Sequence, residues 1–556
     1  MKGRVVNETL EALADEYWDY VLKQDPTQAL MLGIHTHDSE HEDVSRRAED
    51  AEIARLKDFV GRAEVIETAD LTPDERITRE VLIFEAGSTA RKAEGRFAEM
   101  EVNHAIGVQA MLPVVLPQLP LTAPEHAEAM PSKYRGIAKM FDDAAARLGE
   151  GLARGRAPMG STAAKAVEQV DGLLAAPFDQ DPLLALRAPE GWDGEAGWRD
   201  LMVDTAREHL RPAMQRWRDF VTTEVLPAAR SDEEPGLSYL PDGEDLYART
   251  IYRYTTLDKD PGEVHQIGLD QIAKLDEEYR KLGEEVLGTN DLAEIYSRLR
   301  DDPELHHSDG PSIVAASERA LAKAKAAMGD WFDKLPQADC LVKETATGPL
   351  GFYFRPATDG SRPGMFFVNT SDPTAWGTYE IEAFAYHEGI PGHHLQLAIA
   401  GELEGIPEFR KQAFISAYGE GWGLYTERLA DEMGLYESPL HRIGMLSADS
   451  TRAGRLVVDT GIHAMGWSRQ QAIDFMVDNS PNTVFSVEEE IDRYIGMPGQ
   501  ALSYMIGRLE IQRMRRQAEE SMGDGFDIKG FHDTVLGSGL VPLTTLDRLV
   551  EEWAAG

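Results

Sequence analysis

Cysteine is nearly missing from this chain of 556 residues, in which Cys340 is the only one. An intramolecular disulfide is therefore excluded, and so is a zinc site built on several thiolates. Long apolar runs are missing too. None approaches the about 20 residues of a membrane-spanning helix, and the first residues lack the apolar core of a signal peptide. We therefore expect a cytoplasmic protein that does not enter a membrane.

Basic residues are in deficit, because 97 acidic residues stand against 56 basic ones and the formal net charge is −41. Such a surface repels phosphate backbones and anionic lipids, so neither nucleic acid nor a membrane surface is an expected partner. Apolar residues make up 42% and charged residues 28%, which is ordinary for a folded protein. The sequence leaves the oligomeric state open.

Apolar residues recur at helical spacing through most of the chain, for example over 10–21 and 261–287. The exception is 344–370, where two short aromatic runs flank a turn-rich stretch, a pattern that favours a β-hairpin. We predict a mainly α fold with one small antiparallel sheet. A helical N-terminal portion, 1–232, and a metal-binding catalytic portion, 233–556, are expected, and the two can share one core.

The segment around His387-Glu388 carries the strongest chemical signal. In the HExxH motif of zinc peptidases, two histidines one helical turn apart bind the metal, and the glutamate takes a proton from water. Here Pro391 replaces the second histidine, and the next ones are His393 and His394. In a straight helix the first lies about 120° around the axis from His387, and the second about 10.5 Å along it, so neither joins His387 on one ion.

A break in the helix would resolve this misfit. Pro391 has no N–H to bond to the His387 carbonyl, and glycines on both sides lower the cost of a break. We therefore predict that the helix kinks, bulges or stops around 389–392, so that a following histidine returns toward His387. His393 is the first choice for this ligand, and His394 is the second.

A carboxylate from another helix is the expected third ligand. Glu420 and Glu427 lie two turns apart on one face of a predicted helix. We predict Glu420 as the ligand and Glu427 as a carboxylate behind a ligand or facing the substrate, while Asp459 is a further candidate for orienting a histidine. The alternative is an accidental match, with surface histidines and an aromatic stretch that only packs.

Other polar residues fit roles around such a centre. Tyr504 and His463 are candidates for stabilising the oxyanion of peptide hydrolysis, and Arg452 and Arg455, three residues apart, for binding a substrate carboxylate. The alternatives are a core tyrosine, a surface histidine and structural ion pairs.

The strand predicted over Phe366–Thr370 precedes the metal segment. An edge strand near zinc can pair with a peptide backbone, which makes Phe366 and Asn369 candidate substrate-binding residues. The alternative is a β-ribbon that only braces helices.

Three strings resemble the signature of the bacterial family catalogued as domain of unknown function eight-eight-five. They are YHEGIPGHHLQ (Tyr386–Gln396), EGWxxYxE (Glu420–Glu427) and PGQALSY (Pro498–Tyr504), all in roughly the C-terminal third of the chain. That family is similar to glutamate-type zinc metallopeptidases. The resemblance implies a large helical metallopeptidase-like body with the sheet near the metal, and zinc held by His387, His393 and Glu420 with Glu388 as the base.

The leading hypothesis is a zinc-dependent peptidase that hydrolyses short peptides with water activated by Glu388. The alternatives are a zinc-dependent amidase or esterase acting on a small molecule, and a non-catalytic metal-binding scaffold. The presence of Glu388 argues against the scaffold, because a site that only binds metal needs no base.

Overall fold

The computed structural model describes residues 2–357, 360 and 362–556, with side chains from residue 9 onward. Positions 358 and 359, in the turn of the expected hairpin, lie outside the described residues. The first part of the chain forms α1 (Lys2–Gln24), α2 (Pro26–Met31), α3 (Arg46–Glu64), α4 (Pro73–Ala93), α5 (Leu112–Val115), α6 (Pro124–Ala153), α7 (Gly160–Ala175), α8 (Glu195–Thr205) and α9 (Arg211–Phe220).

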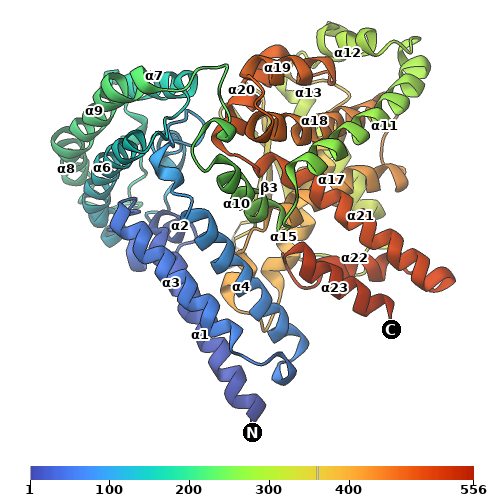
Figure 1. Cartoon of the computed structure of the whole chain (residues 1–556), viewed down its shortest axis with the longest axis horizontal. Coiled ribbons are helices and arrows are strands. Elements are labelled where there is room, and N and C mark those ends of the chain that lie inside the picture. Colours follow the sequence, from blue (N-terminus) through green and yellow to red (C-terminus); the bar gives the residue numbers. More distant parts are fainter. Residues whose placement is uncertain (1, 358–359, 361) are drawn as a thin grey trace.

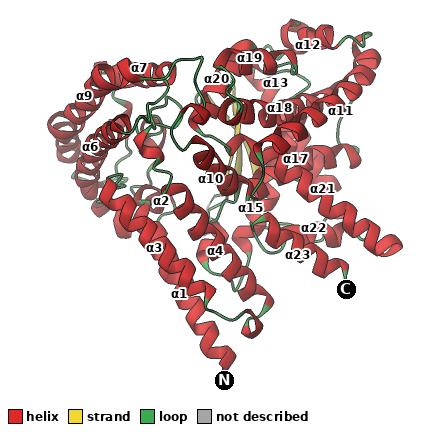
Figure 2. Cartoon of the chain, viewed as in Figure 1, coloured by secondary structure: helices red, strands yellow, loops and turns green. Residues whose placement is uncertain are grey.

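Helices also dominate the second part, so the predicted mainly α fold is confirmed (Figure 2). They are α10 (Gly243–Thr255), α11 (Pro261–Leu287), α12 (Leu292–Asp301), α13 (Gly310–Ala327), α14 (Ile381–Phe384), α15 (His393–Glu402), α16 (Glu408–Gln412), α17 (Ser416–Glu432), α18 (Pro439–Ala464), α19 (Arg469–Asp478), α20 (Val484–Gly496), α21 (Ser503–Met522), α22 (Ile528–Leu536) and α23 (Leu543–Ala554). Across the described residues, no helix combines the length and apolarity needed to cross a bilayer.

Local sequence signals set the ends of α11. The Asp260 side chain accepts hydrogen bonds from the backbone N–H groups of Gly262 and Glu263, and Gly288 ends the helix with a left-handed φ of 71°. The buried side of α11 packs along α18, where Gly268 lies against the side chains of Leu456 and Val457. This pairing holds α18 in place beside the candidate site.

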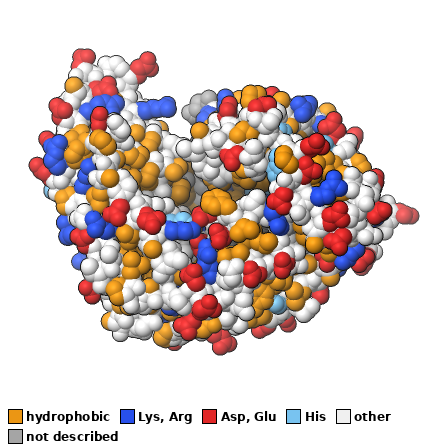
Figure 3. Space-filling model, turned by 90° about the horizontal axis from the view of Figure 1, so that it is seen from above, with side chains coloured by type: hydrophobic (Ala, Val, Ile, Leu, Met, Phe, Trp, Pro, Cys, Tyr) orange, Lys and Arg blue, Asp and Glu red, His pale blue; other side chains and the backbone are white. Residues whose placement is uncertain are grey.

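Three clusters make up the apolar core of the described residues: a larger one, a smaller one, and a minor third one formed mainly by α18, α19 and α20. The smaller cluster contains buried residues of α6–α9, which lie together at the left of Figure 1. The larger cluster joins α1, α3 and α4 to the helices that follow α10. Figure 3 shows the surface hollowed between the part that holds α6–α9 and the rest of the molecule. The division predicted near residue 232 stays a prediction.

The sheet contains β1 (Cys340–Thr345), β2 (Gly351–Phe354) and β3 (Gly364–Asn369), in the order β1-β3-β2. β2 pairs antiparallel with β3, as the expected hairpin requires, whereas β1 pairs parallel with it. The sheet is therefore mixed rather than purely antiparallel. Phe366 and Val368 point from β3 into the core, whereas Phe352 and Phe367 stack on the other face.

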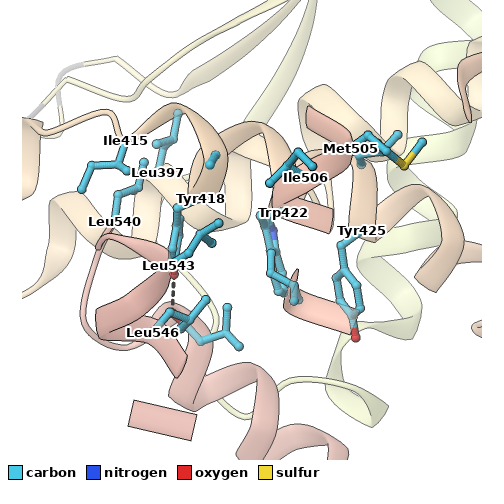
Figure 4. Packing of buried hydrophobic residues seen from close by; sticks show 14 of the residues in the cluster. Leu397, Ile415, Tyr418, Trp422, Tyr425, Met505, Ile506, Leu540, Leu543 and Leu546 are labelled. Carbon is cyan, nitrogen blue, oxygen red and sulfur yellow. Dashed lines mark hydrogen bonds between the residues drawn. The ribbon is translucent and has the colours of Figure 1, made fainter. Parts of the chain in front are cut away.

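Helix α17 is packed tightly between its neighbours. Its aromatic residues Tyr418, Trp422 and Tyr425 lie side by side and point into the core (Figure 4). At Gly421 it approaches α21 so closely that an added Cβ would lie 2.5 Å from the backbone of Gly507. The opposite side of α17 is thereby presented to the segment that carries the histidines.

Candidate metal centre

The helix that carries His387 is interrupted as the sequence predicts. Helix α14 continues into a single π-helical turn, Ala385–Gly389, and α15 begins only at His393. A cis peptide bond joins Ile390 to Pro391. At position 392 an added Cβ would lie 1.9 Å from the His387 carbonyl oxygen, so only glycine fits there. Together, the π-turn and the break change the direction of the chain between His387 and His393.

Side chains from α17 bind the carbonyl groups that the break frees. Trp422 donates through Nε1 to the Pro391 oxygen at 3.0 Å, and Thr426 donates through Oγ1 to the Tyr386 oxygen at 3.1 Å. A buried carbonyl without a partner would cost free energy, so these bonds stabilise the interruption. They also fix α17, with its two glutamates, beside the broken helix.

Three side chains converge at the break. The ligand atoms of His387, His393 and Glu420 all lie within 4.8 Å of one another. Glu420 Oε2 is 3.7 Å from His387 Nε2 and 3.4 Å from His393 Nε2, and the two rings are nearly perpendicular. A tetrahedral zinc ion with bonds of about 2.0–2.1 Å separates its ligand atoms by about 3.3–3.4 Å. Both the donor types and the spacing therefore fit zinc.

His387 is oriented by a second carboxylate. Its Nδ1 donates to Glu427 Oε1 at 2.8 Å, which turns Nε2 toward Glu420. Burial lowers the pKa of His387, but the hydrogen bonds that its ring donates to the Glu420 and Glu427 carboxylates outweigh burial and raise the pKa to about 9. Burial raises the pKa of Glu420, yet His387 and His393 hold it well below its usual range. The two histidines therefore favour the ionised form of Glu420.

His394 points away from this cluster. Its Nε2 donates to the Ala338 carbonyl at 3.0 Å, and its Nδ1 accepts from the Tyr353 hydroxyl at 2.9 Å. Burial lowers the pKa of His394 to about 4, so the ring is neutral at pH 7. Of the two candidate ligands, the structure therefore brings His393 to His387 and ties His394 to the sheet.

Glu388 and Tyr504 flank the centre. Glu388 is half-buried in the π-turn directly after His387, and its charge raises the pKa of both His387 and Cys340. The Tyr504 ring stacks on the His387 ring with centroids 6.5 Å apart. Burial, assisted by the Glu420 charge, raises the pKa of Tyr504, so its hydroxyl keeps its proton. A carboxylate and a hydroxyl donor thus lie beside the three converging side chains.

The structure does not bring His463 and Asp459 into this cluster. His463 Nδ1 accepts from the Leu237 N–H at 3.2 Å and Nε2 donates to the Tyr494 carbonyl at 3.0 Å, which occupies both nitrogens. Asp459 accepts from the Tyr247 hydroxyl and the Gly499 N–H. Both side chains therefore hold connecting segments in place, and among the described residues neither bonds to His387 or His393.

The arginines Arg452 and Arg455 lie on α18, next to Tyr504. The Arg455 guanidinium is 4.5 Å from the centre of the Tyr504 ring, and that of Arg452 is 6.0 Å from it. Arg455 also forms an ion pair with Glu490. Two positively charged side chains therefore lie beside the candidate centre, next to the Tyr504 ring that stacks on His387.

The expected role of Phe366 and Asn369 needs correction. β3 is the central strand, so its backbone is paired on both sides and cannot add a peptide. The Phe366 side chain is fully buried, and Asn369 bonds to the Gly348 carbonyl and to Ser371. The prediction failed because β1, which covers the other edge of β3, was not recognised in the sequence.

Two further residues shape the centre and were not recognised in the sequence. An added Cβ at Gly423 would lie 2.7 Å from the His387 ring, so this glycine leaves room for the imidazole. Gln396 accepts from His393 Nδ1 at 3.4 Å, which orients that ring. The spacing gave a signal for both, because Gly423 follows Glu420 by one helical turn and Gln396 follows His393 by one.

Three other groups of histidines and acids in the described chain fit a metal less well. One of them has an exposed member, Glu437, while its Glu382 accepts from the Glu437 N–H and the Nδ1 of its His441 bonds to Ser438. In the group of His35, Asp38 and His126, the two rings are stacked at 3.4 Å and 5°, so their lone pairs run parallel and do not converge. In the remaining group, Lys165 already pairs with both Glu489 and Asp492. The centre at His387 is therefore the best candidate.

Comparison with known proteins places the chain in a family. No curated protein matches it. Two bacterial proteins of known structure, each described as a "putative lipoprotein", are similar over nearly the whole length. The one from Colwellia psychrerythraea shares 27% identity over 99% of both chains with a TM-score of 0.92. The one from Shewanella oneidensis shares 19% identity over 97% of this chain and 98% of its own, with a TM-score of 0.77.

A family model, described as a bacterial protein of unknown function, matches residues 26–550. The match includes all of the residues that converge at the candidate centre, and it extends far beyond the C-terminal third in which the motifs lie. The chain therefore belongs to the DUF885 family of bacterial proteins.

Proposed function

We propose that this protein is a zinc-dependent peptidase that hydrolyses short peptides. One observation carries the proposal: His387, His393 and Glu420 converge with the donor types and spacing of a zinc site, and Glu388 follows the first ligand directly. Two histidines and a glutamate, with Glu388 as the base, are the parts that metal-assisted hydrolysis requires.

The residues have separate tasks in this reaction. A zinc ion at the centre would polarise the substrate carbonyl and lower the pKa of water. Glu388 accepts a proton from the attacking water and passes it to the leaving amine as the C–N bond breaks. Tyr504 keeps its proton, because its pKa is raised, and donates a hydrogen bond to the oxyanion. Glu427 holds His387 in the tautomer that directs Nε2 to the metal.

Burial of the centre favours short substrates. His387 and His393 are less than 9% exposed, and Glu420 is only partly exposed. A folded protein cannot bring a peptide bond to such a centre, whereas a short flexible peptide can. A small amide or ester would also reach it, so the assay has to include both kinds of substrate.

The test combines metal analysis with matched variants. We expect purified protein to contain about one zinc per chain, and Glu388→Gln to lower kcat for peptides about 10²–10⁴-fold while zinc content is unchanged. Glu404→Gln, at an exposed position outside the centre, should leave kcat unchanged. A folded protein without zinc, or unchanged hydrolysis by Glu388→Gln, would contradict the proposal. Faster turnover of non-peptide amides or esters would favour the alternative hydrolase.

The cellular location is a separate question. The cytoplasmic location stays a prediction from the sequence, whereas the description of the two relatives as lipoproteins favours the cell envelope. Fractionation of cells that express the complete native gene distinguishes the two, because only an envelope protein sediments with membranes.

A further inference from the structure

Arg455 has an unsatisfied donor beside the candidate centre. Its side chain donates through Nε to the Tyr494 hydroxyl at 2.7 Å and through Nη2 to Glu490 at 2.8 Å. Its Nη1 is buried and has no hydrogen-bond acceptor among the described residues. Glu490 is shared with Arg493, which binds it at 2.9 Å, so one carboxylate faces two guanidinium groups. The group as a whole keeps a net positive charge.

Arg452 adds a second guanidinium, which unlike that of Arg455 forms no ion pair in the described part of the chain. Its Nη1 contacts the Ala448 carbonyl at 3.4 Å, and its buried Nε has no partner there. Glu380 is near enough for the Arg452 charge to lower its pKa, but its oxygens bind the Ser447 hydroxyl and the Gly377 N–H instead. Arg452 therefore has no carboxylate in direct contact among the described residues.

Both arginines are close to the metal-binding residues. The Arg455 and Arg452 guanidinium groups lie 4.5 and 6.0 Å from the centre of the Tyr504 ring, and this ring stacks on His387. The charge of Glu420 raises the pKa of Tyr504 and the charge of Arg455 lowers it, so both groups lie near this tyrosine. The unsatisfied N–H donors and the positive charge of the two arginines therefore lie next to the Tyr504 ring, which stacks on His387.

We propose that Arg452 and Arg455 bind the C-terminal carboxylate of the substrate, so that the enzyme removes one or a few residues from the C-terminus of short peptides. This inference rests on the proposed peptidase function. A carboxylate would give the buried Arg455 Nη1 an acceptor and neutralise the excess charge, and guanidinium binds it through paired hydrogen bonds. Each extended residue spans about 3.3 Å, so a few residues cover the spacings of 4.5 Å from Arg455 to the Tyr504 ring and 6.5 Å from that ring to the His387 ring.

The experiment compares two peptides that differ only at their C-terminus, one a free acid and the other an amide. With zinc-loaded protein we expect kcat/KM for the acid to exceed that for the amide about 10–100-fold, because a hydrogen bond to a charged group is lost. In Arg452→Gln the ratio should approach one, through a loss on the acid alone. Arg516→Gln, an exposed arginine of α21, is the matched control and should keep the full ratio.

Two outcomes would overturn the inference: equal kcat/KM for acid and amide in the unchanged protein, or an equal loss on both peptides in Arg452→Gln, as a structural role predicts. Arg455→Lys, which keeps the charge, provides a second variant and should reduce the ratio only in part. If the zinc-loaded protein hydrolyses neither peptide, a binding titration with the same pair decides. Tighter binding of the acid would keep the carboxylate site and reject the peptidase, and equal binding would reject the site.

Discussion

At the scale of single residues, Gly423 determines whether the His387 ring fits beside α17. An added Cβ would lie 2.7 Å from the ring, and the ring cannot withdraw because Glu427 holds its Nδ1. We expect Gly423→Ala to weaken zinc binding about 10–100-fold, the range seen when the support of a ligand is lost. Competition with a chromophoric chelator measures the zinc affinity.

A second glycine provides the control. Gly401 lies on α15 with nothing within 4 Å of an added Cβ, so Gly401→Ala should leave zinc affinity unchanged and stabilise the helix by about 0.5–1 kcal/mol. Equal zinc affinity in the two variants would show that the space at Gly423 does not matter.

The choice between His393 and His394 shows what the sequence leaves undetermined. The misfit of Pro391 with a straight helix predicts the break, because the missing N–H is a local property. Which of two adjacent histidines turns toward His387 depends on distant partners, since Ala338 and Tyr353 bind the other one. Pairing over such separations does not show in a local pattern.

At the scale of elements, the contact between α17 and α21 positions Glu420 relative to Tyr504. An added Cβ at Gly507 would lie 1.8 Å from the Ala417 carbonyl oxygen, which is backbone and cannot move alone. We expect Gly507→Ala to separate the helices and lower the free energy of unfolding by about 1–3 kcal/mol. Urea denaturation measures this, and an unchanged midpoint would contradict the close packing.

His463 joins α18 to the segments around Leu237 and Tyr494, and makes this connection sensitive to acid. Burial lowers its pKa to about 3, from about 6.5 in an unfolded chain. Between these values only the unfolded chain takes up the proton, so stability falls by about 1.4 kcal/mol per pH unit as the pH decreases.

We therefore expect the stability advantage of the unchanged protein over His463→Gln to shrink from pH 7 to pH 5. Urea denaturation at several pH values measures the difference. A constant difference over this interval would mean that His463 does not carry the acid sensitivity.

The sheet was predicted only in part. The aromatic runs of β2 and β3 gave the hairpin, because alternation and a turn are local signals. β1 was not predicted because Lys343 and Glu344 interrupt its apolar pattern and half of its residues are exposed. Since a parallel partner is distant in sequence, only the tertiary structure shows that β3 is central.

At the scale of the whole molecule, the net charge of −41 opposes the compact state by self-repulsion. Salt shortens the screening length from about 30 Å at 0.01 M to about 8 Å at 0.15 M. We expect Tm to rise on the order of a few °C over this interval. Thermal unfolding followed by circular dichroism measures it, with sucrose at matched osmolality in low salt as the control for uncharged solutes. A Tm that is constant or falls would mean that local ion pairs outweigh the repulsion.

The helical spacing of apolar residues predicted the helical class of the molecule, but which helices share a core depends on tertiary packing. Buried residues of α1, α3 and α4 join the larger core, although they lie far in sequence from the centre at His387. Amphipathic spacing shows that a helix has a buried face, and it does not show which partner covers that face.

The single thiol, that of Cys340, can be used to follow the opening of strand β1. Burial raises the pKa of Cys340 to about 12, so the folded chain holds almost no reactive thiolate at neutral pH. A disulfide reagent will therefore modify the half-buried thiol slowly in the folded protein and faster when the strand that bears it opens. His394 bonds to Ala338, two residues before Cys340, and the adjacent His393 faces the candidate centre. A comparison of the modification rate of Cys340 with and without zinc therefore measures how much a bound ion stabilises that end of the sheet.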